Sequence, residues 1–126
     1  MKFLIADDAM VMRNITKNVL RENNFDDECF LEAGDGETAL ELAGKETIDL
    51  FLVDWNMPKL DGLEFVKRIR TMPQYALTPI IMITSEAAKY NVMEAIEAGT
   101  TSYVVKPLKG KILWDKISKF IPDGAV

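Results

Sequence analysis

The chain has 126 residues, a net charge of −5, one cysteine and no histidine. This length and a hydrophobic content of 48% predict one globular domain, residues 1–126, and the acidic balance argues against a nucleic-acid partner. The missing histidine excludes imidazole zinc sites and Ser–His or Cys–His nucleophile pairs, and a single cysteine excludes an internal disulfide or a cysteine metal cluster.

Five short apolar segments predict β-strands. In chain order they lie at about 2–6, 28–32, 50–53, 80–83 and 103–105. Four of them are continuously apolar, which is typical of strands that are buried on both faces of a parallel sheet. The segment 28–32, with the sequence ECFLE, instead alternates, and this pattern favours a strand at the edge of the sheet.

Amphipathic stretches of helical length follow the strands. In the first and the fourth stretch, apolar residues at helical spacing are expected to face the core. These residues are Met12, Ile15 and Val19, and Val92, Met93 and Ile96. Helices are expected around the first group and at 36–45, 63–71, 87–98 and 109–121.

The strict alternation of strands and helices predicts the fold class. In one domain it indicates a parallel sheet with right-handed crossovers and with helices on both faces. A closed eight-stranded barrel needs about twice this length. We therefore expect an open, doubly wound, five-stranded sheet with five helices, in which ligands bind beyond the carboxyl ends of the strands.

Polar residues follow four of the five predicted strands. Asp7 and Asp8 follow the first strand, Asp54 ends the third, Thr84 follows the fourth and Lys106 follows the fifth. The carboxyl ends of parallel strands meet at one edge of the sheet, so these side chains are expected to lie together. Three neighbouring carboxylates repel one another strongly unless a cation or raised pKa values intervene. Oxygen ligands without histidine or cysteine suit magnesium better than zinc.

Such a cluster is suited to phosphoryl transfer. A magnesium ion held by few carboxylates keeps positions open for phosphate oxygens, while Thr84 can donate to a phosphoryl oxygen and Lys106 can pair with its charge. One carboxylate can then attack phosphorus and form an acyl phosphate, although the spacing leaves open which one. Taken singly, the aspartates are typical of helix caps and turns. Their joint placement with Thr84 and Lys106 favours the phosphoryl site.

Four motifs carry a resemblance to a known family. The segments ADD at 6–8, VDWNMPKLDG at 53–62, MITSE at 82–86 and YVVKP at 103–107 resemble the receiver domain of two-component response regulators, and within that family the single-domain chemotaxis regulators. The likeness covers essentially the whole chain. It implies the flavodoxin-like strand order 2-1-3-4-5, which the residues alone do not establish.

The resemblance also implies a role for each site residue. It makes Asp54 the phosphoacceptor and gives Thr84 and Lys106 contacts with the phosphoryl group. Asp7 and Asp8 become the acidic pair that holds Mg²⁺, or Mn²⁺, together with Asp54. The ligand set implied for this metal is Asp7, Asp8, Asp54 and the backbone carbonyl of Asn56.

Further residues are implied to regulate the phosphorylated state. Tyr103 matches an aromatic switch that turns inward as Thr84 moves toward the phosphate, and Asn56 and Glu86 match positions that tune the lifetime of the acyl phosphate. The Lys106–Pro107 peptide bond is expected to be cis. The expected output surface is lined by Lys89, Tyr90, Tyr103, Val105 and Lys116.

The expected function is therefore that of a mainly monomeric chemotaxis regulator. A histidine kinase would supply the phosphoryl group, a flagellar motor switch protein would receive the signal, and a phosphatase is a further candidate partner. The tail PDGAV contains no DNA-binding module, so output is expected through contact with a partner. The chain is not expected to be a classical turnover enzyme, although it would assist its own phosphorylation and dephosphorylation.

Three alternatives can be compared with this interpretation. A stand-alone receiver in another phosphorelay would have the same site. An aspartyl-phosphate phosphatase or mutase usually needs a dedicated acid/base and a lid, which the short loops do not supply. A flavodoxin-like electron carrier needs a phosphate-binding loop after the first strand, where ADDAMVM instead carries two negative charges. Because no segment resembles a targeting signal or a membrane-spanning helix, we expect a cytoplasmic protein without a membrane partner.

Overall fold

Five parallel strands form one sheet in the order β2-β1-β3-β4-β5 in the computed structural model, which describes residues 1–122. The strands are β1 (Phe3–Ala6), β2 (Phe30–Ala33), β3 (Leu50–Val53), β4 (Ile80–Thr84) and β5 (Ser102–Val105). The expected flavodoxin-like order is therefore confirmed. Most of the PDGAV tail, residues 123–126, lies outside the described residues.

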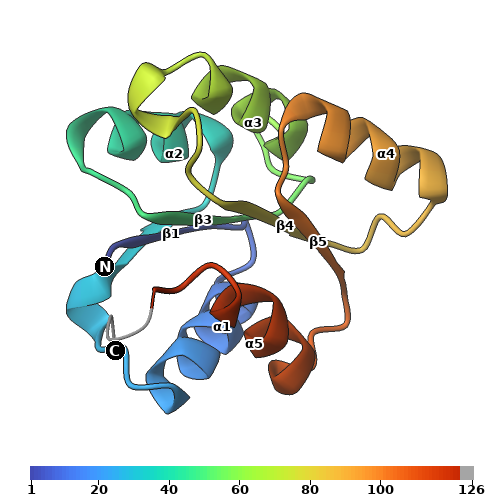
Figure 1. Ribbon diagram of the computed structural model, residues 1–126. Helices are drawn as coiled ribbons and strands as arrows, with labels where there is room; N and C mark the ends of the chain where they lie inside the picture. Colours follow the sequence, from blue (N-terminus) through green and yellow to red (C-terminus); the bar gives the residue numbers. More distant parts are fainter. Residues whose placement is uncertain (123–126) are drawn as a thin grey trace.

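Helices follow the strands as the alternation predicted. They are α1 (Met10–Glu22), α2 (Gly36–Lys45), α3 (Gly62–Arg70), α4 (Lys89–Ala98) and α5 (Gly110–Ser118), with short 3-10 turns at Asp27–Cys29 and Pro73–Tyr75. Figure 1 shows α2, α3 and α4 on one face of the sheet and α1 and α5 on the other. Within residues 1–122, no helix is long and apolar enough to cross a membrane.

The continuous apolar strands supply two cores because neighbouring side chains of a strand point to opposite faces. On β3, Phe51 and Val53 pack beneath α2 and α3, whereas Leu50 and Leu52 pack against α1 and α5. The same division holds on β1 and β4. Both faces of the central strands are therefore shielded from solvent, which explains why every residue of these segments is apolar or nearly so.

Two helical stripes that were expected in the core meet it only in part. On α1 the residues that face the sheet are Thr16, Val19 and Leu20, while Ile15 is partly exposed. The buried side of α1 thus contains Thr16 in place of Ile15. Thr16 can be buried because its hydroxyl donates a hydrogen bond to the carbonyl of Met12, at 3.1 Å.

The second difference from the expected core concerns α4 and β5. On α4 Ala95 is buried, whereas Met93 and Ile96 are 52% and 55% exposed. The strand β5 is not buried on both faces as expected, since Val105 is 42% exposed. Both elements lie at the edge of the sheet, where a strand has a neighbour on one side only and the helix above it has less surface to cover.

Candidate functional site

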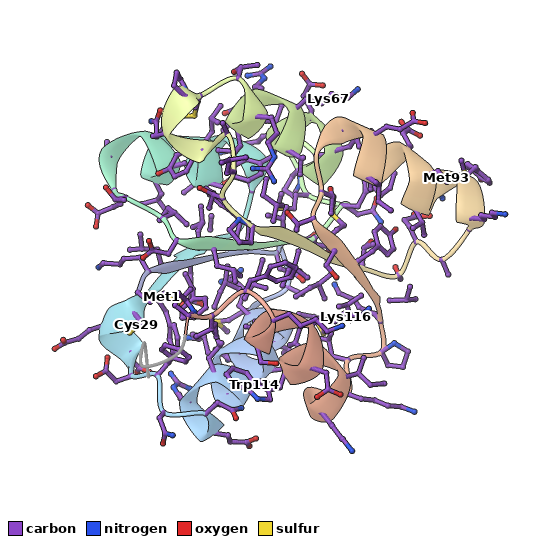
Figure 2. The ribbon with its side chains drawn as sticks, viewed as in Figure 1. Met1, Cys29, Lys67, Met93, Trp114 and Lys116 are labelled. Atoms are coloured by element: carbon purple, nitrogen blue, oxygen red, sulfur yellow. The ribbon has the colours of Figure 1, made fainter. Side chains whose placement is uncertain are left out.

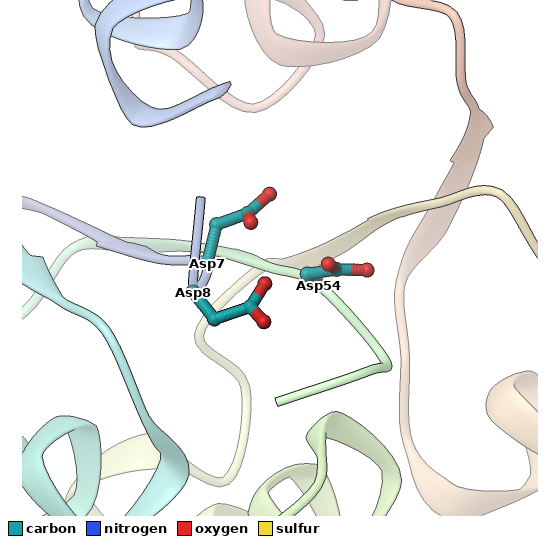
Figure 3. A group of neighbouring side chains, drawn as sticks. All are labelled: Asp7, Asp8 and Asp54. Atoms are coloured by element: carbon teal, nitrogen blue, oxygen red, sulfur yellow. The ribbon is translucent and has the colours of Figure 1, made fainter. Parts of the chain in front are cut away.

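The carboxyl ends of β1, β3, β4 and β5 bring together Asp7, Asp54, Thr84 and Lys106, as the alternation predicted. The pair β1 and β3 is the point at which the strand order reverses, and such points form the ligand crevice of open α/β sheets. Figure 3 shows the side chains of Asp7, Asp8 and Asp54 directed into a common space beyond these strand ends.

Hydrogen bonds fix both the side chain and the backbone of Asp7. The residue is 6% exposed, and its Oδ1 accepts a hydrogen bond from the backbone N–H of Ala9 at 2.9 Å. Arg13 reaches back from α1 and donates from Nη1 to the carbonyl oxygen of Asp7 at 2.6 Å. Sequence reasoning missed Arg13, because a contact from a helix to a backbone carbonyl leaves no motif.

The segment that follows Asp54 turns sharply to begin α3. Asp61 caps α3 by accepting from the backbone N–H of Glu64 at 2.8 Å. Gly62 donates its N–H to the carbonyl of Trp55 at 2.7 Å, and an added Cβ at Gly62 would lie 2.1 Å from the carbonyl oxygen of Asp54. The cap Asp61 and the close contact at Gly62 thus hold the backbone of Asp54 against the start of α3 and leave its carboxylate free to face the site.

Lys106 bridges two of the carboxylates. Its Nζ lies 2.9 Å from Asp7 Oδ2 and 3.2 Å from Asp54 Oδ2, and its backbone N–H donates to the carbonyl of Thr84 at 2.8 Å. The Lys106–Pro107 peptide bond is cis, as the family resemblance implied. A single ammonium group therefore faces both strand ends that flank the crevice.

The charges of the site shift its proton affinities. Burial raises the pKa of the Asp54 carboxyl and the charge of Asp7 raises it further, while the charge of Lys106 opposes both. Burial alone would lower the pKa of Lys106, but its hydrogen bond to Asp7 and the charge of Asp54 outweigh that effect and raise it. The ammonium group is therefore fully charged at neutral pH. Ionisation of Asp54, by contrast, lowers the stability of the folded protein.

This cost predicts a pH-dependent effect of Asp54→Asn on stability. A raised pKa means that Asp54 favours the folded state below its ordinary pKa of 3.8 and loses that contribution as the pH rises through the raised value. Without divalent ions, Asp54→Asn is expected to raise the free energy of unfolding at neutral pH, with the gain shrinking toward pH 3.8. Urea denaturation across this range measures the difference, and a gain that is constant with pH would contradict the assignment.

The donor set fits a hard divalent cation. Asp7, Asp8 and Asp54 each offer a carboxylate oxygen, and these oxygens all lie within 4.8 Å of one another. Asp7 and Asp54 are buried, whereas Asp8 is exposed and gives access from solvent. Oxygen-only ligands of this kind match magnesium or manganese rather than zinc.

The loop between β4 and α4 connects the site to an aromatic residue. Thr84 is fully buried, and its Oγ1 accepts from the backbone N–H of Glu86 at 3.4 Å. Tyr103 packs against the core, and its hydroxyl donates to the backbone carbonyl of Glu86. The ring of Tyr103 is thus already turned inward, in the arrangement that the resemblance associated with the phosphorylated state.

The two residues expected to tune phosphate lifetime contact one another. The Nδ2 group of Asn56 donates to Glu86 Oε1 at 3.3 Å, and the second carboxylate oxygen of Glu86 accepts from Asn91 Nδ2 at 3.2 Å. Asn91 lies on α4 and was not singled out from the sequence, because an Asn within a helix carries no sign of what it contacts. These three side chains join the loop after β3 to the start of α4.

The expected output surface lies around α4 and β5. Lys89, Tyr90 and Val105 are exposed there, and Tyr103 and Lys116 are half-buried. Figure 2 shows Met93 on the outward side of α4 and Lys116 on α5. Met93 and Ile96, which were expected in the core, instead add apolar area to this surface.

Comparison with known proteins places this geometry in context. Residues 3–118 match the family model described as the response regulator receiver domain. The chain is 40% identical to a chemotaxis protein CheY homolog of Campylobacter jejuni over 99% of this chain and 95% of that protein. It superposes on the chemotaxis response regulator CheY4 of Vibrio cholerae with a TM-score of 0.87 and 32% identity, covering 95% of this chain and 98% of the other.

A third similar structure carries a metal ion. It is the receiver domain of a sensor histidine kinase from Pseudomonas aeruginosa, solved with a magnesium ion coordinated in its active-site cleft. The TM-score is 0.83 at 25% identity, and the match covers 94% of this chain and 95% of that one.

Proposed function

This chain belongs to the response regulator receiver family, and we propose that residues 1–126 act as one receiver domain of the chemotaxis type, activated by phosphorylation of Asp54. The observation that carries the proposal is the double contact of Lys106 with Asp7 and Asp54 at the point where the strand order reverses. Such a site is built to hold an anion beside a carboxylate nucleophile.

The phosphodonor is a histidine kinase. A carboxylate oxygen of Asp54 attacks the phosphorus of a phosphohistidine, a P–O bond forms as the P–N bond breaks, and the histidine nitrogen keeps the bonding electron pair. Lys106 pairs with a phosphoryl oxygen, and the hydroxyl of Thr84 donates to another once it moves toward the site. Magnesium held by Asp7, Asp8, Asp54 and the carbonyl of Asn56 would offset the charge that gathers during transfer.

Magnesium binding can be tested first. Titration of Mg²⁺ is expected to change the fluorescence of Trp55, which adjoins Asp54 in the chain, with weak and saturable binding. Asp8→Ala should lower the affinity at least about tenfold because it removes one of the three carboxylate donors. The matched control is Asp115→Asn, an exposed carboxylate on α5, which should bind as the parent does. Equal affinity in Asp8→Ala and the parent would contradict the ligand set.

The signal passes to a protein partner through the output surface. We propose a flagellar motor switch protein, because the Campylobacter jejuni relative is a chemotaxis protein homolog and because exposed Lys89 precedes exposed apolar side chains on α4. An acidic amphipathic segment would complement this surface. A receiver from another relay would share the phosphorylation site but would not bind such a segment.

Binding of a switch-protein peptide is expected to tighten when beryllofluoride mimics the phosphoryl group. Typical couplings correspond to about 5–150-fold in affinity. Lys89→Ala should weaken binding in both states, and Thr84→Ala should reduce the gain, because Thr84 contacts the backbone of Glu86, whose carbonyl accepts from Tyr103. Lys45→Ala, an exposed lysine on α2, is the control. An affinity that is indifferent to beryllofluoride would contradict this output.

A further inference from the structure

Arg70, the last residue of α3, meets backbone groups from three other segments. Its Nε and Nη2 donate to the carbonyl of Gly99 at 2.9 and 2.8 Å, and its Nη1 donates to the carbonyls of Tyr75 and Thr78, both at 2.7 Å. Nη2 also lies 3.2 Å from Thr101 Oγ1. The five N–H donors of the guanidinium group are thus matched by acceptors in one half-buried place.

The contact with Gly99 fixes the point where α4 ends. Gly99 has a φ of +118°, a left-handed conformation that favours glycine, and an added Cβ would lie 2.6 Å from Arg70 Cγ. Thr101, which begins the connection to β5, is tied in as well, since its hydroxyl accepts from both Arg70 and the backbone N–H of Ile80. Arg70 therefore joins the end of α3, the end of α4 and the start of β4.

Burial does little to fix α4. Ala95 is buried, but Tyr90, Met93 and Ile96 are 72%, 52% and 55% exposed. The beginning of α4 has no side-chain cap, and Glu86 holds it through Asn91. Glu86 is also the residue that contacts Thr84 and Tyr103. The N-terminal end of α4 is thus tied to the candidate phosphoryl site, and the C-terminal end to Arg70.

We infer that Arg70 is a positioning residue that holds the C-terminal end of α4 in place, so that α4 turns about the Arg70–Gly99 contact when its N-terminal end moves. The turning movement rests on the proposed function, because phosphorylation is what displaces the loop between β4 and α4. A helix fixed at one end converts a small shift of Glu86 into a reorientation of Tyr90 and Met93.

The fixed end is tested in the resting protein, without any phosphoryl mimic. Amide hydrogen exchange is compared in the parent, Arg70→Met and the milder Arg70→Lys, which keeps the charge but loses the planar fork. The N–H groups of Gly99 and Thr100, which donate to the carbonyls of Ile96 and Ala95, should exchange about tenfold faster in Arg70→Met, relative to amides of α2. Arg68→Met is the control, since Arg68 is exposed and pairs with Glu64 at 3.6 Å, far from Gly99 in the chain.

The turning movement is tested by adding beryllofluoride and magnesium. In the parent, changes in amide chemical shift along α4 should be largest near Tyr90 and decrease toward Gly99, and Arg70→Met should remove this decrease. Unchanged relative exchange at Gly99 and Thr100, or an equal rise in every element, would overturn the inference, as would parent shifts as large at Gly99 as at Tyr90. A parent that takes up no beryllofluoride would contradict the proposed function instead, and exchange in the resting protein would still decide the role of Arg70.

Discussion

Replacing Asp54 by Asn is expected to abolish the phosphoryl label that a small phosphodonor transfers to the protein. In the parent, acetyl phosphate or phosphoramidate should label Asp54 only when a divalent ion is present, because the cation offsets the charge shared by phosphate and carboxylate. Asn has a similar shape but no carboxylate nucleophile, so the labelling rate should fall at least about a thousandfold. Mass spectrometry after borohydride trapping locates the label.

The control for this experiment is Asp61→Asn. Asp61 lies seven residues further along the same loop, where it is exposed and caps α3, and Asn is an equally good cap. This variant should be labelled as the parent is, and the product should be base-labile like an acyl phosphate. Equal labelling of Asp54→Asn, or a label on a serine or threonine, would refute the assignment of the phosphoacceptor.

Gly62→Ala is expected to destabilise the protein strongly. The new Cβ would lie 2.1 Å from the carbonyl oxygen of Asp54 and 2.8 Å from Trp55 Cα, and neither backbone atom can move aside as a flexible side chain can. Overpacking of this kind costs about 3 kcal/mol in the free energy of unfolding. The loop that carries Asp54 must shift to relieve the contact, so phosphorylation should also slow.

Gly44→Ala is a matched comparison that is expected to change stability in the opposite direction. Gly44 lies inside α2, and an added Cβ there would meet nothing within 4 Å. Alanine in a helix is more stable than glycine by about 0.5–1 kcal/mol, so this variant should gain stability and keep its phosphorylation rate. Urea denaturation of the two variants and the parent measures both effects, and a loss in Gly44→Ala similar to that in Gly62→Ala would refute the role of the close contact.

The fold was predictable because its signals are local and repeated. A strand such as Leu50–Val53, buried on both faces, is apolar at every position, and the helices between strands show their own period. The site followed from the fold, since parallel strands must bring Asp7, Asp54 and Lys106 to one edge. The strand order required the family resemblance, because apolar runs do not reveal which strands are neighbours.

What the sequence did not reveal depends on contacts between distant segments. Periodicity identified the apolar stripe on α4 that contains Met93 and Ile96, but it cannot tell whether a stripe meets a core or a solvent-facing surface. Arg13 and Arg70 act through backbone carbonyls, and any residue can supply a carbonyl, so no pattern marks their partners. The roles of Thr84, Tyr103 and Glu86 remain predictions, and Thr84→Ala tests the first of them.

The ion pairs of Lys106 have a consequence for how the protein matures. They join residues 99 and 52 positions apart, and such distant contacts form late because long loops must close first. The ribosome makes Asp7 and Asp54 before it makes Lys106. A nascent or partly folded chain therefore carries the carboxylates without the ammonium group that makes the crevice receptive to an anion. Under the proposed function, Asp54 is therefore expected to accept a phosphoryl group only after β5 has joined the sheet and placed Lys106 beside it.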